Sequence, residues 1–234
     1  MRIYVFVEGP SDGLALSALW STWLAGLTAK GHGIRVIPLP SKAEYLKNIG
    51  HRAAEMLANN AEDLVVGLPD LYPNAEYSST RFRHDDLAAL EALQRDSVRR
   101  NLRQHYSSVV DADQCVADRF FASAFKHDSE MLLLASKAAL RSHLRTDHNL
   151  GKWIHPVENQ NQFKPPKRVV EDLFLQYRKT VYRDTKDAKA VLDRVSDMSQ
   201  VLFDDNRQVQ CPVFKGVVDW IAQKTGVSAY EAPK

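Results

Sequence analysis

Three acidic residues, Glu8, Asp70 and Glu130, each follow a predicted strand at the point where a turn or helix begins. If strands and helices alternate along the chain, these junctions lie at one edge of a parallel sheet. Hard divalent cations take oxygen ligands, and carboxylates crowded together favour binding one. Such an ion bridges phosphate oxygens and orients a water for hydrolysis. The residue types therefore predict a site for Mg²⁺ or Mn²⁺, with Asp12 as a further candidate ligand.

Each of these acids also has a purely structural explanation. Asp12 can complement the positive end of a helix dipole, and Glu8 can be a solvated turn residue. Asp70 can be a turn residue before a proline, and Glu130 a first-turn acid. The residues alone leave both explanations open.

His127 precedes Glu130 by three positions, about one helical turn, so both side chains can face the same way. A histidine there can shuttle protons or contact a phosphate, and a buried or capping histidine is the alternative. Further along, four residues form a predicted basic surface with a stacking ring for nucleic acid: Lys167, Arg168, Tyr177 and Lys179. A solvated helix face explains these four equally well.

The elements that must position these residues follow from apolar patterning. Residues 3–7 are mostly β-branched or aromatic and predict a buried strand, and a helix follows from Ser11. A second strand is predicted over 34–39, where Pro38 favours a sheet edge or a strand end. Ser41 and Glu44 form a capping-box pattern that opens a helix. Further strands are predicted over 64–68 and 116–125, with a helix over 87–102 between them.

This order predicts an α/β fold with a mostly parallel sheet flanked by helices over residues 1–150. Residues 151–234 are expected to form a C-terminal helical region packed on that domain, with helices over 167–180, 187–203 and 212–224.

The composition and charge of the chain exclude some classes of function. The chain has 234 residues, 44% of them hydrophobic, and a formal net charge of +2, so any nucleic-acid binding must use a local patch. Cys115 and Cys211 have no metal-ligand spacing. Glu8 and Asp12 interrupt any signal-peptide pattern, and no apolar run is long enough to span a bilayer. We expect a cytoplasmic protein with no membrane partner.

The run Val7-Glu8-Gly9-Pro10-Ser11-Asp12 resembles the first motif of Toprim domains. These domains are the metal-binding fold of topoisomerases, bacterial primases and overcoming-lysogenization-defect nucleases. In them the glutamate of a V-E-G-x-x-D run lies at the catalytic centre, and Glu8 matches it. More specifically, the chain resembles the Toprim-like bacterial family catalogued as domain of unknown function 4276. Four regions carry this resemblance in order: residues 7–12, 70–72, 127–133, and a tail of 166–179 with 211–220.

One residue departs from the usual Toprim pattern. Catalytic Toprim domains carry an Asp-x-Asp pair after the third strand, and Tyr72 stands at the second of these positions. The resembled family shares this change. Glu130, Asp12 or Asp128 would then have to complete the metal coordination, and the number of ions stays open.

The resemblance implies a metal-dependent nuclease that hydrolyses DNA or RNA with Glu8, Asp70, Glu130 and His127 at its centre. It also implies an effector in bacterial antiviral defence that works with an ATPase of the ATP-binding-cassette type. The alternative is a non-catalytic Toprim-like module that docks on such an ATPase or senses a nucleotide or phage component, and Tyr72 supports it.

Overall fold

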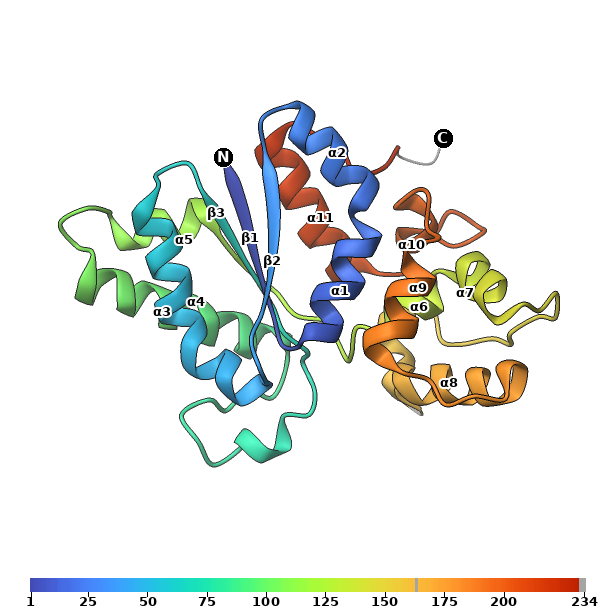
Figure 1. The fold of residues 1–234 in the computed structure, drawn as a ribbon. Helices are drawn as coiled ribbons and strands as arrows, with labels where there is room; N and C mark the ends of the chain where they lie inside the picture. The colour runs from blue at the N-terminus through green and yellow to red at the C-terminus, as the bar shows by residue number, and fades with distance from the viewer. Residues whose placement is uncertain (163, 232–234) are drawn as a thin grey trace. The chain divides into compact units, whose positions relative to one another are not determined.

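The computed structural model describes residues 1–162 and 164–231. The chain forms two compact units (Figure 1): unit 1 is Met1–Pro10 with Leu27–Ala124, and unit 2 is Ser11–Gly26 with Phe125–Lys234. The predicted α/β class is confirmed. The predicted domain boundary near residue 150 stays a prediction, because units grouped by contacts need not be folding domains. Among the described helices, none is both long and apolar enough to cross a membrane.

Unit 1 contains a four-stranded sheet in the order β2-β1-β3-β4. Its strands are β1 (Arg2–Val7), β2 (Gly33–Pro38), β3 (Leu64–Leu68) and β4 (Phe120–Ala122), and every pairing is parallel. In this register Val7 lies between Pro38 and Leu68, so the carboxyl ends of the three longer strands are level. The position of β2 at the edge agrees with what Pro38 predicts.

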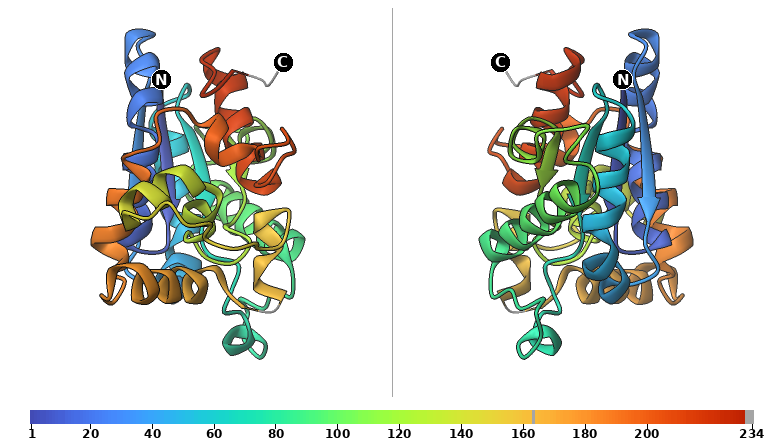
Figure 2. Two further views of the ribbon diagram at one scale, coloured as in Figure 1. Left: turned by 90° about the vertical axis from the view of Figure 1, so that its right-hand side faces the viewer. Right: turned by 90° about the vertical axis from the view of Figure 1, so that its left-hand side faces the viewer.

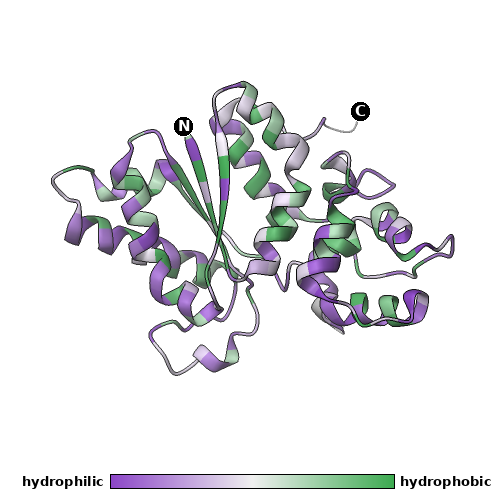
Figure 3. Cartoon of the chain, in the orientation of Figure 1, coloured by the Kyte–Doolittle hydropathy of each residue, from purple (hydrophilic) through white to green (hydrophobic). Residues whose placement is uncertain are grey.

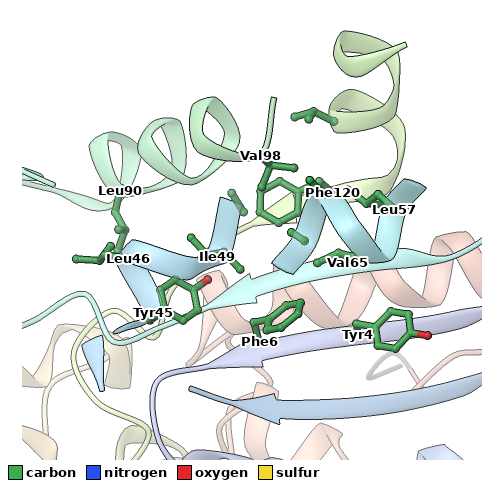
Figure 4. Close-up of a cluster of buried hydrophobic side chains, with 14 of the residues drawn as sticks. Tyr4, Phe6, Tyr45, Leu46, Ile49, Leu57, Val65, Leu90, Val98 and Phe120 are labelled. Carbon is green, nitrogen blue, oxygen red and sulfur yellow. The ribbon is translucent and has the colours of Figure 1, made fainter. Parts of the chain in front are cut away.

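Three helices of unit 1 accompany the sheet: α3 (Lys42–Asn59), α4 (Leu87–His105) and α5 (Ala112–Arg119), with a short 3₁₀ turn, η1 (Ala75–Tyr77), before α4. Helices α3 and α4 pack side by side (Figure 2, right). Phe6 and Val65 project toward α3 and share a core with Ile49, Leu57 and Val98 (Figure 4). The strands are accordingly rich in hydrophobic residues, whereas α4 is largely hydrophilic on its outer side (Figure 3).

A buried polar network lies beside the carboxyl end of β3. Tyr45 Oη donates a hydrogen bond to Gln94 Oε1 at 2.7 Å, and Gln94 Nε2 donates to the Ser123 carbonyl at 2.9 Å. A Cβ atom at Gly67 would overlap both Gln94 Oε1 and Tyr45 Oη. Glycine at this position therefore lets the network approach the strand just before the chain reaches Asp70.

The remaining helices belong wholly or mainly to unit 2: α1 (Pro10–Leu19), α2 (Ser21–Ala29), α6 (Met131–Ala135), α7 (Lys137–Leu144), η2 (Val157–Gln162), α8 (Pro166–Leu173), η3 (Phe174–Arg178), η4 (Asp184–Ala188), α9 (Lys189–Leu192), α10 (Ser199–Leu202) and α11 (Pro212–Thr225). Three of them are not α-helical: η3 and η4 are π-helical turns, and η2 is a 3₁₀ helix.

Two predicted elements are wrong. Residues 116–125 are not one strand, because Asp111 caps α5 by accepting the backbone N–H groups of Asp113 and Gln114 at 2.9 and 3.0 Å. The helix then runs to Arg119 and leaves only three residues for β4. Residues 187–203 are not one helix either, since Asp197 accepts the Ser199 N–H at 2.8 Å and starts a new turn.

Candidate functional site

Glu8 and Asp70 meet at the carboxyl edge of the sheet in unit 1. Glu8 directly follows β1, and Asp70 follows the neighbouring β3 by two residues. Glu8 Oε2 accepts the backbone N–H of Asp70 at 3.3 Å. Both residues are half-buried. The structure thus brings together two of the carboxylates that the sequence singles out.

Lys42, at the start of α3, adds a cation to this pair. Its side chain is buried, with 4% exposure, and Nζ donates hydrogen bonds to the carbonyls of Leu71 at 2.7 Å and Pro73 at 2.6 Å. Burial lowers the pKa of Lys42 to about 8, while Glu8 and Asp70 act to raise it. Lys42 therefore holds the loop after Asp70 and places positive charge near both carboxylates.

The residues predicted from the sequence do not include Lys42, although its position in the helix indicates an unusual role. Lysine is unfavourable in the first turn of a helix, where the dipole favours acids, and Lys42 directly follows the N-cap Ser41. A lysine at such a position needs another partner. The carbonyls of residues 71 and 73 are that partner.

Tyr72, two residues after Asp70, has a packing role. Its side chain is partly buried and packs against the apolar core of unit 1. The side chain at this position therefore packs and supplies no carboxylate, where the Toprim pattern has a second aspartate.

A second group of acids lies in unit 2. Asp12 Oδ1 accepts a hydrogen bond from Ser129 Oγ at 2.7 Å. Glu130, which is 5% exposed, accepts one from Tyr182 Oη at 3.2 Å, and its Oε1 lies 3.9 Å from Lys167 Nζ. These contacts give each buried acid at least one partner.

Burial dominates the electrostatics of this second group. It raises the pKa of Asp128 to about 6 and that of Glu130 to about 7, with Lys167 acting in the opposite direction on both. Asp128 Oδ2 accepts the Lys167 backbone N–H at 3.3 Å. Its Oδ1 is buried and has no hydrogen-bond partner among residues 1–162 and 164–231.

A divalent cation such as Mg²⁺ needs oxygen ligands close together. Within the described part of each unit, no group of three or more histidine, cysteine or acidic side chains lies close enough to hold one. Mg²⁺ usually keeps several waters and needs only one or two carboxylates besides substrate phosphates. Glu8 and Asp70 fit that requirement in number and in donor type. Glu130 belongs to unit 2, so an ion shared with Glu8 stays a prediction.

His127 is buried in unit 2, with 8% exposure. Burial lowers the pKa of its imidazole to about 4, and the neighbouring Lys126 adds to this effect. The ring is therefore uncharged at neutral pH. A proton shuttle works best with a pKa near the working pH, and the catalytic role of His127 stays a prediction.

The four residues of the predicted basic surface have different surroundings. Lys167 Nζ lies 3.2 Å from an Asp184 carboxylate oxygen, and Arg168 pairs with Glu171 at 2.6 Å. The Tyr177 ring stacks on His148 with centroids 6.3 Å apart, and Lys179 is exposed at the end of η3. Lys167 thus joins the acidic group, and a role for the four in binding nucleic acid stays a prediction.

Comparison with known proteins gives a limited result. No family model matches the chain, and no curated protein sequence matches it. Similar solved structures include three of the C-terminal region of the Xanthomonas campestris pv. campestris OLD protein. The one phased with mercury is 15% identical with a TM-score of 0.44 and covers 96% of each chain. The one phased with platinum is 13% identical with a TM-score of 0.42 and covers 95% of this chain and 96% of that one. No residue of this chain receives a role from these similarities.

Proposed function

We propose that this chain is a metal-dependent nuclease that hydrolyses phosphodiester bonds in DNA or RNA. The observation that carries the proposal is the meeting of Glu8 and Asp70 after adjacent parallel strands, with the Glu8 carboxylate 3.3 Å from the Asp70 backbone nitrogen. In open α/β sheets, ligands bind outside the carboxyl ends of the strands. The resemblance of residues 7–12 and 70–72 to Toprim motifs supports the same site.

In this proposal Glu8 and Asp70 hold Mg²⁺ or Mn²⁺. When bound, the ion supplies charge stabilisation for the phosphate and a more acidic water. Glu8 is fixed by the Asp70 N–H, and Lys42 fixes the following loop through the Leu71 and Pro73 carbonyls. These contacts hold the Glu8 carboxylate and the loop that follows Asp70 before substrate arrives, which favours catalysis because less reorganisation remains to be done.

We further propose that the protein acts in the cytoplasm as an effector of bacterial antiviral defence together with an ATP-binding-cassette ATPase. The resemblance to the family catalogued as domain of unknown function 4276 supports this context. Glu130, Asp12 and His127 are proposed as further site residues, and Lys167, Arg168, Tyr177 and Lys179 as contacts to nucleic acid.

A second candidate function is a non-catalytic module that docks on such an ATPase. Two observations favour it: Tyr72 packs in the core where a second acid would bind metal, and the Lys42 ammonium already balances charge near Glu8 and Asp70. One lysine offsets one of the two carboxylate charges, which lessens the need for an ion at this site.

Cleavage assays on DNA and RNA with Mg²⁺ or Mn²⁺, with and without the partner ATPase, separate the two candidates. Glu8→Gln and Asp70→Asn should each lower cleavage by at least about a hundredfold, because they remove ligand charge without changing shape. Glu62→Gln, at an exposed position of unit 1, is the matched control and should cleave normally. Wild-type cleavage by Glu8→Gln in the presence of the ATPase would leave the docking module as the function.

A further inference from the structure

A cavity of about 730 Å³ lies along the edge strand β2 in unit 1. Neither Glu8 nor Asp70 lines it. Its apolar lining comes from Tyr4 and Phe6 of β1, Ile37 of β2 and Met56 of α3. A volume of this size falls in the range of about 300–1,000 Å³ that small-molecule sites occupy.

The register explains why these side chains converge. Tyr4 pairs with Arg35 and Phe6 with Ile37, so the four side chains share one face of the sheet. On α3, Arg52 and Met56 are four residues apart and therefore lie on the same side of the helix. Since β2 is only partly buried along its length, the cavity opens to solvent beside it.

Three arginines add positive charge to this apolar cavity. Asp63, which also lines the cavity, accepts the backbone N–H of Arg2 at 2.8 Å. Arg35 and Arg52 are exposed, and their side chains pair with no acid in the described part of the chain. On α4, by contrast, the side chains of Arg99 and Arg103 both form ion pairs with Asp113, at 2.8 and 2.6 Å. Arg35 and Arg52 thus present unneutralised guanidinium groups at a cavity large enough for a ligand.

We infer that this cavity binds a free nucleotide, with its phosphates at Arg35 and Arg52 and its base against Ile37 and Met56. Guanidinium groups recognise phosphate oxygens through paired, charge-assisted hydrogen bonds. The apolar lining suits the flat body of a base, and the Asn59 side chain, which also lines the cavity, offers both a donor and an acceptor. The site goes beyond the proposed nuclease function and holds whether or not Glu8 and Asp70 are catalytic.

A free nucleotide fits better than a nucleic-acid strand. A strand needs a basic groove that follows successive phosphates, with aromatic rings exposed for stacking. Here the rings of Tyr4 and Phe6 are almost fully buried, with 8% and 1% exposure, and form the floor of the cavity instead of exposed stacking surfaces. The Arg35 and Arg52 guanidinium groups both lie at this one cavity and do not follow a groove.

The test is calorimetric titration of the full chain with AMP, ATP and GTP, and with tripolyphosphate as a probe that lacks a base. At least one nucleotide should bind saturably and more tightly than tripolyphosphate. Arg35→Gln combined with Arg52→Gln should weaken that binding at least about tenfold, because both charge-assisted contacts are lost. Arg100→Gln, at an exposed position of α4 outside the cavity, should change it less than about twofold.

Met56→Ala separates base from phosphate recognition. It should weaken nucleotide binding while leaving tripolyphosphate binding unchanged, since only the base contact is lost. If the double variant does not fold, Arg52→Gln alone, at an exposed helix position, should still weaken nucleotide binding. The inference is overturned if no nucleotide binds at millimolar concentration or if tripolyphosphate binds as tightly as the nucleotides. Binding of oligothymidylate without any mononucleotide binding would also overturn it.

Discussion

Glu8 directly follows β1 and Glu130 directly precedes α6, and their surroundings differ. Glu8 is half-buried, accepts a backbone N–H, and has the cation of Lys42 near it. Glu130 is 5% exposed, and burial raises its pKa to about 7. A metal ligand must be ionised, so the raised pKa of Glu130 works against metal binding at neutral pH. The position of a carboxylate in a strand-helix pattern therefore predicts where it lies along the fold, but not whether it can bind a metal ion.

The two regions also use lysine differently. Lys42 is buried and directs its ammonium at two backbone carbonyls, which fixes a loop. Lys167 is partly exposed and directs its ammonium at Asp184 and Glu130. Burial lowers the pKa of Lys167, but Glu130 and Asp184 outweigh it and the net pKa is raised. Removing Lys42 should therefore cost more stability than removing a surface lysine.

The largest effect on stability is expected for Lys42→Met. This change leaves the Leu71 and Pro73 carbonyls without their donor and should lower the free energy of unfolding by about 3 kcal/mol. Lys47→Met, on the same helix in an exposed pair with Glu44, should cost less than about 0.5 kcal/mol. Urea unfolding measures both. Equal losses would mean that Lys42 is no more than another solvated lysine.

The second prediction is a pH dependence that has opposite signs for the two regions. Because the pKa of Glu130 is about 7 instead of 4.5, and that of Asp128 about 6 instead of 3.8, the folded chain binds more protons than the unfolded chain between these values. Stability should then fall as the pH rises from about 4 to 7, by an amount on the order of 2 kcal/mol.

Lys42 acts in the other direction at higher pH. Its pKa is about 8 instead of 10.5, so the unfolded chain binds more protons in that interval and stability should rise with pH. Urea unfolding at a series of pH values, with chelator present, tests both windows. Glu130→Gln should flatten the first and Lys42→Met the second. A Glu130→Gln profile that matches the wild type would contradict the buried-acid description of unit 2.

The smallest effect is expected for Tyr182→Phe. This change removes the hydrogen bond to Glu130 Oε1 and should cost about 1 kcal/mol. Tyr177→Phe is the matched control, because the Tyr177 hydroxyl forms no hydrogen bond with the described residues, and it should have almost no effect on urea unfolding. Similar losses for both variants would show that Glu130 does not depend on its phenol partner.

Local patterns predicted the elements around Glu8 and Asp70 well. Residues 64–68 are the strand that their apolar run predicts, and Ser41 Oγ accepts the Glu44 N–H at 3.3 Å, which is the N-cap half of the predicted capping box. The strand predicted over 116–125 is wrong because Val116 and the phenylalanines after it suit a buried helix or a strand equally. The cap at Asp111 favours a helix, which runs to Arg119.

Contacts between distant parts of the chain could not be predicted in the same way. Lys42 gains its role from carbonyls about thirty residues away, at 71 and 73, and no local pattern contains that information. Likewise, residues 11–26 group with residues 125–234 and leave the strand that precedes them in the other unit. Glu130 is likewise contacted by Tyr182, which lies 52 residues away along the chain.

The most direct test of the central claim, that Glu8 and Asp70 form the metal site, is a calorimetric titration with Mn²⁺ at neutral pH. The wild type should bind saturably, and Glu8→Gln or Asp70→Asn should weaken binding at least about tenfold, because each removes one anionic ligand. Glu62→Gln should bind as the wild type does. If Glu8→Gln bound Mn²⁺ with unchanged affinity, the metal site would not be at the carboxyl edge of this sheet, and the claim would be wrong.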